Sequence, residues 1–191
     1  MKKILKALLL VTVVVTMVAC GEEEFDVFNL FDTTNYEIPT TKDRENVSKS
    51  TFDNSIVGYG WKEIETHEIN PDGSYTRENY WAYRDGDGPK VYEFLPEEAI
   101  TYFFNDADLT GDSFRRESCS YNENGNIISL DGYPTIRIIH FGETKIKAVV
   151  RAGVTFDRDA NSYRNVFLYV TLQRMSAEEL EKEREAHNFH D

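Results

Sequence analysis

The sequence has few of the residues from which catalytic and metal sites are usually built, with four histidines and two cysteines among 191 residues. No two histidines show the His-x-x-x-His spacing that holds zinc on one helix face. The Gly-x-Ser-x-Gly turn, the phosphate-binding glycine loop and the dinucleotide fingerprint are also missing. Carboxylates are so abundant that no acid–base pair stands out. We therefore expect a protein that is not an enzyme and that needs no cofactor.

Positive charge is scarce as well. The chain has 21 Lys and Arg against 34 Asp and Glu, which gives a formal net charge of −13. A field of this sign repels phosphate backbones, so nucleic acid is not an expected partner. The same field opposes electrostatic binding to anionic lipid.

A long hydrophobic run is missing, but a short one lies at the N-terminus. Three lysines begin the chain, an apolar stretch follows over 8–18, and Ala19-Cys20 ends it. A transmembrane helix needs about 20 apolar residues, so this stretch is too short. A basic start, a short apolar segment and a small residue before a cleavage site are typical of a secretory signal. Residues 1–19 are therefore predicted to be a signal peptide.

The cysteine after Ala19 makes this segment resemble the signal of bacterial lipoproteins, although Met17 stands where that family usually has Leu. The resemblance implies cleavage before Cys20, lipid on Cys20 and a membrane anchor. Several acyl chains hold a protein firmly, at about 0.8 kcal/mol per buried CH₂. Cys119 would then be the only thiol, so no intramolecular disulfide could form. No histidine or basic cluster adjoins Cys119, so we expect a small buried side chain rather than a nucleophile.

Residues 20–54 are predicted to form a polar tether. Glu22-Glu23-Glu24 resembles the surface-export signal of Bacteroidetes lipoproteins, and Asp32-Thr33-Thr34 resembles the O-glycosylation triplet of that phylum. Each run also has a simpler alternative, a solvated spacer for the first and a chance match for the second. Apolar side chains recur here too, so part of this arm should pack on the domain or pair with a sheet edge: Phe25, Phe28, Leu30, Phe31 and Tyr36.

The region 55–175 lacks long helical segments and shows repeated aromatic and β-branched runs. The runs predicted to be strands are 57–69, 74–83, 90–95, 98–105, 114–121, 126–131, 135–141, 145–152 and 164–174. Short turns rich in Gly, Asp and Asn separate them, and connections this short require antiparallel neighbours. Closing the sheet removes the exposed edges that an open sheet would leave. The predicted fold class is therefore all-β, an antiparallel up-and-down β-barrel of about eight strands.

A family resemblance supports the barrel. Val57-Gly58-Tyr59-Gly60-Trp61-Lys62, followed by Asn70-Pro71-Asp72-Gly73, looks like the opening of lipocalin-like domains. That family begins with Gly-x-Trp on the first strand and an Asp-Gly hairpin after it, whereas here a second glycine, Gly60, precedes the tryptophan. The resemblance implies that Trp61 lies at the barrel floor and helps to close it. A β-sandwich would show similar strands and stays an alternative.

Residues 176–191 are predicted to be a C-terminal helix and tail. Ser176-Ala177-Glu178-Glu179 is a capping box, which favours a helix from there to about Ala186. Glu178 precedes Lys182 by four residues, a spacing that brings the two charges together on a helix surface. A short polar helix after the last strand also resembles the lipocalins.

One loop has the spacing of a calcium site. Its oxygen-bearing side chains are Asp106, Asp108, Thr110, Asp112 and Glu117, with a glycine at the sixth loop position. The flanking sequences read as strands rather than helices, and Arg115 and Arg116 would repel the ion. The simpler interpretation is a hairpin loop rich in turn residues, so no metal is expected.

Aromatic side chains are the best candidates for a binding site. They recur at every second position of several predicted strands, where they could line a cup in the barrel. The candidate ligand-binding residues are Trp61, Tyr75, Trp81, Tyr83, Tyr92 and Tyr102. The alternative is that they fill the barrel as core, since small barrels are packed with side chains.

These patterns predict a lipoprotein of the bacterial cell envelope, anchored to the outer membrane through Cys20 and exposed at the surface if the export signal is real. Its predicted function is a non-catalytic binding module for a small apolar or amphipathic ligand. The alternative is an accessory protein with a filled barrel, whose outer face docks another envelope protein.

Overall fold

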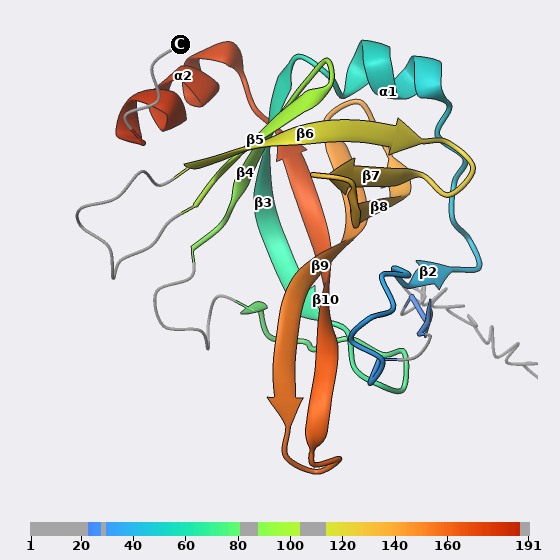
Figure 1. Cartoon of the computed structure of the whole chain (residues 1–191). Helices are drawn as coiled ribbons and strands as arrows, with labels where there is room; N and C mark the ends of the chain where they lie inside the picture. Colours follow the sequence, from blue (N-terminus) through green and yellow to red (C-terminus); the bar gives the residue numbers. More distant parts are fainter. Residues whose placement is uncertain (1–22, 28–29, 81–87, 104–113, 188–191) are drawn as a thin grey trace, which may run out of the picture.

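The computed structural model describes residues 23–27, 30–80, 88–103 and 114–187 (Figure 1). These residues form two short helices and ten strands. The elements are β1 Phe25–Asp26, β2 Thr40–Thr41, α1 Lys49–Ser55, β3 Tyr59–Glu68, β4 Val91–Leu95, β5 Glu98–Tyr102, β6 Phe114–Asn122, β7 Ile127–Leu130, β8 Tyr133–Phe141, β9 Lys145–Asp157, β10 Ser162–Arg174 and α2 Ala177–Ala186.

Eight of the strands close into a barrel. Their order is β10-β3-β4-β5-β6-β7-β8-β9, and every neighbouring pair is antiparallel. The predicted fold class, an up-and-down barrel with a C-terminal helix, is thus confirmed. β9 and β10 are the longest strands, and their hairpin extends beyond the rest of the barrel (Figure 1).

The alternation of β10 explains how this strand is buried. Every second residue joins the main core inside the barrel: Val166, Leu168, Val170 and Leu172. Phe167 and Tyr169 face outward, where they are buried in a second cluster with Phe25 of the N-terminal segment. Both faces of β10 are therefore buried, one by the barrel core and one by the segment that precedes the barrel.

The predicted strand over 74–83 is wrong for its described part, 74–80. Only an isolated bridge between Ile69 and Tyr75 forms there. The physical reason is that β3 pairs directly with β4, through Trp61 and Tyr92 among others, which leaves no place for a strand between them. The ring of Tyr75 instead packs outside the barrel against Tyr169, with 5.3 Å between ring centroids.

The described part of residues 23–47, here called the arm, packs on the outside of β8, β9 and β10. Phe25 is 4% exposed and pairs with Thr41 across β1 and β2. Its backbone N–H donates to the Gly73 carbonyl at 2.9 Å. Gly73 has a φ of +85°, and a Cβ there would lie 2.4 Å from the Phe25 carbonyl oxygen, so glycine permits this close approach. The prediction that part of the arm packs on the domain is confirmed.

Helix α1 closes one end of the barrel, whereas the sequence predicts a polar tether for this segment. Ser48 is the N-cap, and its hydroxyl accepts a backbone hydrogen bond from the first turn at 3.0 Å. Phe52 is 3% exposed and stacks on Tyr121 at 4.2 Å between centroids. Just after the helix, the Ile56 carbonyl accepts a hydrogen bond from Trp61 Nε1 at 3.2 Å. The segment therefore works as a plug of the barrel.

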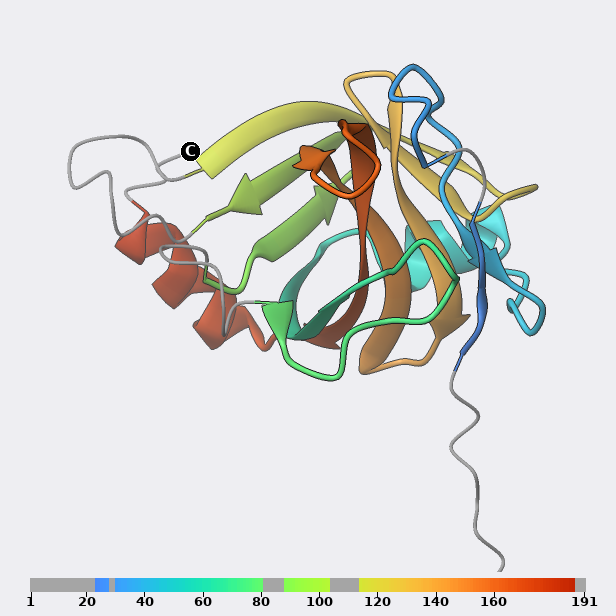
Figure 2. The same cartoon turned by 90° about the horizontal axis from the view of Figure 1, so that it is seen from below.

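Helix α2 covers the outer wall on the side of β3, β4 and β5. Its capping box is present as predicted, with Glu179 N donating to Ser176 Oγ at 3.2 Å and Ser176 N donating to Glu179 Oε2 at 2.7 Å. Leu180 packs so closely over Gly60 that a Cβ on that glycine would lie 2.8 Å from Leu180 Cδ1. The second glycine before Trp61 therefore serves helix packing. Figure 2 shows α2 and the arm on opposite sides of the barrel.

A partly buried ion pair ties α2 to the wall. The Arg184 guanidinium binds the Glu93 carboxylate, which is 2% exposed, and Tyr102 donates to the same carboxylate at 2.9 Å. Burial, followed by the hydrogen bond to Glu93 and the negative charge of Glu93, raises the pKa of Tyr102. His187, at the end of the helix, stacks on Tyr102 at 5.5 Å between ring centroids, and burial lowers the pKa of its imidazole.

Candidate binding site

The structure does not gather the predicted ligand-binding residues in one cup. Trp61 and Tyr92 lie in the main core inside the barrel. Tyr75 packs outside the barrel beneath the arm, and Tyr102 lies outside it beneath α2. Trp81 and Tyr83 lie outside the described residues. The aromatic rows therefore serve three separate clusters.

The barrel interior next to α1 is filled with side chains. The main core combines aromatic and aliphatic side chains from α1 and from seven barrel strands, and Cys119 and Tyr121 of β6 pack against it. Its largest fully buried members are Trp61, Phe94, Ile56, Ile128, Ile136 and Ile138. These side chains are packed against one another as core.

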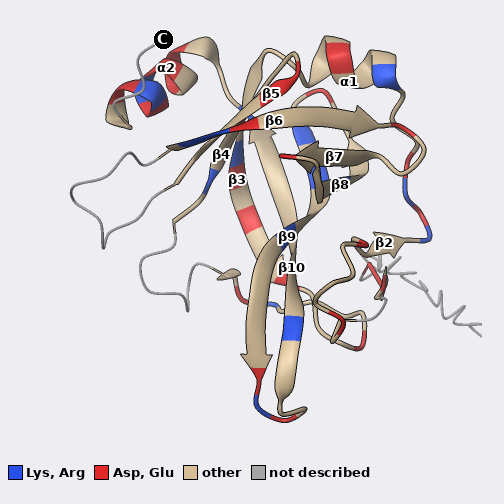
Figure 3. Cartoon of the chain, viewed as in Figure 1, with Lys and Arg blue, Asp and Glu red and all other residues tan. Residues whose placement is uncertain are grey.

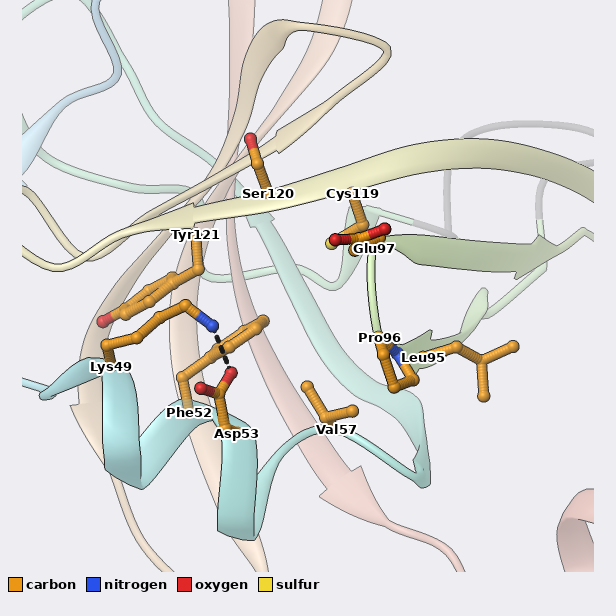
Figure 4. A pocket seen from close by; sticks show the side chains of 10 residues that line it. All are labelled: Lys49, Phe52, Asp53, Val57, Leu95, Pro96, Glu97, Cys119, Ser120 and Tyr121. Atoms are coloured by element: carbon orange, nitrogen blue, oxygen red, sulfur yellow. Dashed lines mark hydrogen bonds and ion pairs between the residues drawn. The ribbon is translucent and has the colours of Figure 1, made fainter.

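A pocket of about 470 Å³ opens beside this core, between α1, the β4–β5 turn and β6 (Figure 4). Typical small-molecule sites have volumes of about 300–1,000 Å³. The lining side chains are Lys49, Phe52, Asp53, Val57, Leu95, Pro96, Glu97, Cys119, Ser120 and Tyr121. The site is called the α1 pocket below.

The walls of the α1 pocket are mainly apolar. Phe52 and Tyr121 form one wall as a parallel stack with an angle of 4° between the rings. Val57 rises from the end of α1 toward Pro96 on the opposite side (Figure 4). The Tyr121 hydroxyl donates to the Val47 carbonyl at 2.7 Å, which holds the ring in place. Burial raises the pKa of Tyr121 to about 12, so its hydroxyl remains protonated at neutral pH.

The rim of the α1 pocket is charged. Lys49 forms an ion pair with Asp53 one helical turn later, and both side chains are about half exposed, at 53% and 47%. Glu97 lies across the pocket with a φ of +66°, and its carbonyl accepts a hydrogen bond from Cys119 N at 2.8 Å. An apolar cleft with ionic groups at its mouth suits a ligand that is apolar at one end and polar at the other.

The Cys119 thiol lines this pocket in a form that is unreactive at neutral pH. Burial raises its pKa to about 11, and the positive charge of Lys49 only partly offsets this effect. A thiol nucleophile needs the opposite shift. The sequence predicts a small buried side chain, and the structure confirms this only in part, since Cys119 is partly buried against the main core.

A buried carboxylate, that of Glu63, lies next to the Tyr92 hydroxyl. The Tyr92 hydroxyl donates to Glu63 Oε1 at 2.9 Å, and Lys90 N donates to Glu63 Oε2 at 3.1 Å. Burial, followed by the charges of Glu63 and Glu117, raises the pKa of Tyr92 well above its usual range. The buried hydroxyls of Thr66 and Thr101 find no hydrogen-bond partner among the described residues. The surroundings of Glu63, Thr66 and Thr101 are thus polar, whereas the walls of the α1 pocket are mainly apolar.

A smaller pocket of about 360 Å³ lies between the start of β3 and α2. Its main feature is the Arg174 guanidinium, which lies 3.3 Å from the centroid of the Tyr59 ring. Gly60 and Leu180 also line it, and these two residues form the contact that holds α2 on the barrel. We therefore regard this pocket as part of the helix packing.

The remaining sequence candidates fall partly outside the described residues. These are the lipidation residue Cys20 and the calcium-loop residues Asp106, Asp108, Thr110 and Asp112. Glu117 is described and lies on β6, where burial raises the pKa of its carboxyl group and Arg115 Nη1 approaches it at 3.8 Å. Within the described part of the chain, no three His, Cys, Asp or Glu side chains are grouped so as to hold a metal ion.

Sequence reasoning missed the residues of α1 that line the pocket. A signal was present, because Ser48 is a good N-cap and Phe52 and Ile56 are spaced by four residues, as on one helix face. The pairing of Phe52 with Tyr121, 69 positions later, is set by the fold and has no local pattern.

Comparison with known protein families, curated proteins and solved structures finds no match to this chain. Among the described residues, no helix has the length and hydrophobicity needed to cross a membrane.

Proposed function

We propose that this chain is a lipid-anchored lipoprotein of the bacterial cell envelope whose lipocalin-like barrel is a non-catalytic binding module. The observation that carries the binding function is the α1 pocket, with apolar walls from Phe52, Val57 and Tyr121. Its ligand class is a small apolar or amphipathic molecule. The signal-like N-terminus and Cys20 support the lipid anchor in the cell envelope, with the outer membrane as its proposed location, and Glu22-Glu23-Glu24 supports exposure at the cell surface.

We propose that the binding site is the α1 pocket rather than a cup at the barrel mouth. Trp61 and Tyr92 are packed core residues at 0% and 3% exposure, so they shape the barrel rather than face a ligand. Val57 and Cys119 are only partly buried and are open to an incoming molecule. The apolar part of the ligand would contact these side chains, and its polar part would lie near Lys49 and Glu97.

The chemistry of the pocket favours binding over catalysis. Its one thiol has a raised pKa, which suppresses the thiolate that nucleophilic catalysis requires. Lys49 and Asp53 neutralise each other at the surface rather than within the cleft. We therefore propose a carrier or sensor role without a chemical step.

A filled barrel supports one alternative, an accessory protein that docks an envelope partner through its outer face. The closely packed main core around Phe94 and Ile138 is the observation behind it. The two functions differ in whether the α1 pocket holds a molecule.

Two measurements test the binding function. Native mass spectrometry of residues 21–191, purified without lipid, should show a retained organic mass that is lost on unfolding. Titration with the apolar dye N-phenyl-1-naphthylamine should show fluorescence enhancement, and Val57→Trp should weaken dye binding by about tenfold, or about 1.4 kcal/mol, because the larger ring fills the pocket.

Asn54→Trp is the matched control, since Asn54 is an exposed α1 residue that does not line the pocket. It should leave dye affinity unchanged. A bare protein mass together with equal dye binding by both variants would reject ligand binding in the α1 pocket and favour the docking alternative.

A further inference from the structure

The outer face of the β9–β10 hairpin ends in an exposed apolar patch. Val154, Phe156 and Tyr163 are 48%, 47% and 62% exposed, and they are called the hairpin patch here. Phe156 and Tyr163 are cross-strand partners whose rings meet edge to face at 5.3 Å between centroids. The charged residues at this end of the hairpin are Arg164 on β10, Asp157 at the end of β9, and Arg158 and Asp159 in the turn (Figure 3). Clustered exposed aromatic side chains of this kind mark interaction sites.

The arm docks on the same face of the hairpin. Alternate residues of a strand share a face, so Tyr163, Asn165 and Tyr169 of β10 point the same way. Asn165 N donates to the Leu30 carbonyl at 2.8 Å. Further along, the Tyr169 hydroxyl donates to Glu23 Oε1 at 2.6 Å. Tyr169 lies six positions after Tyr163, so the patch is about 20 Å from the Glu23 contact along this face.

Glu23 is fixed on the barrel close to the proposed anchor. Besides the bond from Tyr169, Lys147 Nζ lies 3.4 Å from Glu23 Oε1, and His140 Nε2 lies 3.3 Å from the same oxygen. Two residues separate Glu23 from Cys20, so the two Cα atoms can lie at most about 11 Å apart. A lipid on Cys20 therefore holds this outer face near the bilayer surface, because no long tether intervenes.

We propose that the hairpin patch is a second membrane contact, whose side chains enter the bilayer interface when the lipid on Cys20 is inserted. This inference rests on the proposed lipid anchor. Phe and Tyr rings suit the boundary between headgroups and acyl chains. Phe31, 47% exposed on the arm next to Leu30, adds an apolar side chain between the two contacts. Because the chain is acidic, the contact is apolar rather than electrostatic.

Two contacts fix the orientation of the barrel on the membrane. Helix α1 lies at the end of the barrel away from the hairpin tip (Figure 1). The α1 pocket would therefore face away from the bilayer and remain open to the medium. A single flexible tether would leave the pocket without a preferred direction.

The test uses the full chain, processed by a bacterial host, with Cys119→Ser to remove the native thiol. Tyr163→Cys carries the dye NBD in the patch, and Ser50→Cys carries it on the exposed side of α1 as the matched control. Intact mass first shows whether Cys20 carries acyl chains. Each labelled protein is then placed in vesicles of phosphatidylethanolamine and phosphatidylglycerol, with or without lipids that bear a nitroxide at the headgroup.

The dye on Tyr163→Cys should show a blue-shifted emission and lose about half of its intensity or more to the nitroxide lipids, while the dye on Ser50→Cys should keep both. Added Phe156→Ser should reduce the quenching.

An acylated protein with no quenching in the patch, or with equal quenching at both positions, would overturn the membrane contact and leave the anchor intact. Quenching that needs an envelope extract would assign the patch to a protein partner. A blue shift that disappears as the protein is diluted in the bilayer would assign the patch to a second copy of the chain. Either outcome would also overturn the membrane contact. Absence of acyl mass would overturn the anchor itself.

Discussion

At the scale of single residues, Asn126 joins the arm to the barrel. It is fully buried, and its amide group donates to the Glu45 and Ile138 carbonyls while its Oδ1 accepts from Val47 N at 3.1 Å. Asn126→Ala should lower the free energy of unfolding by about 3 kcal/mol or more, because buried backbone groups lose their partners. Urea denaturation measures this change. Asn124→Ala, in the exposed part of the same turn, should stay within about 0.5 kcal/mol, and an equal effect of both variants would contradict the role of Asn126.

Cys119 provides a residue-scale prediction about pH. Its pKa is raised to about 11 by burial, whereas a cysteine in an unfolded chain titrates near 8.5. In a Cys20→Ala chain, alkylation of Cys119 by iodoacetamide at pH 8 should be about 100-fold slower in the folded protein than in urea. Because the unfolded chain ionises first, the free energy of unfolding should be highest below pH 8.5 and should fall as pH rises toward 11.

The rate of alkylation, followed by mass spectrometry between pH 7 and 11, checks the prediction. It should rise about tenfold per pH unit over most of this range. A folded protein that reacts at pH 8 as fast as in urea would mean that the thiol is solvated. The presence of a bound ligand should slow the reaction further, because Cys119 lines the α1 pocket.

At the scale of elements, α2 is held to the barrel by charge as well as by Leu180. Arg184→Met removes the cationic partner of the Glu93 carboxylate. This carboxylate is 2% exposed, and the Tyr102 hydroxyl still donates a hydrogen bond to it. The loss of stability should be about 2 kcal/mol or more, because an uncompensated charge stays buried. Thermal unfolding followed by circular dichroism measures it.

The exposed pair of Lys182 and Glu178 on the same helix supplies the control. Its side chains are 68% and 81% exposed, so Lys182→Met should change stability by less than about 0.5 kcal/mol. If both variants had the same small effect, Glu93 would be hydrated in solution and α2 would be held by its apolar contacts alone.

At the scale of the whole molecule, the arm and the barrel form one folding unit. Phe25 of β1 is buried against Tyr75 and Tyr169, whose ring centroids lie 6.2 and 5.0 Å from its own. Phe25→Ala should lower the free energy of unfolding by about 3–4 kcal/mol, because the cavity cannot collapse against a rigid sheet. It should also expose the arm to trypsin at Lys42 and Arg44. Denaturation and limited proteolysis measure the two effects.

Phe31→Ala is the control for the arm, since its ring is 47% exposed. It should change stability by about 0.5–1 kcal/mol or less and leave the proteolysis pattern unchanged. A Phe25→Ala protein that remains as stable and as resistant as the control would mean that the arm is an independent tether.

The sequence by itself determined an all-β fold with antiparallel neighbours, because turn residues and short spacings leave no other connection, whereas the closure into a barrel rather than a sandwich was decided by the tertiary structure. Asp131-Gly132 illustrates this, since both residues adopt positive φ, 49° and 80°, in the hairpin between β7 and β8. The capping box of α2 was equally readable, because Ser176 and Glu179 act within one helical turn. Local patterns suffice where the interacting groups are a few residues apart.

The tertiary structure alone decided which aromatic side chains share a site. Tyr92 and Tyr102 looked alike in sequence, yet one lies inside the barrel and the other outside it beneath α2. Both faces of β4 are buried, so alternation could not tell inside from outside. The α1 pocket likewise joins Phe52 to Tyr121 and Pro96, which are distant in the chain. Such contacts depend on how the barrel closes and on where the arm and the two helices pack, and no local pattern encodes them.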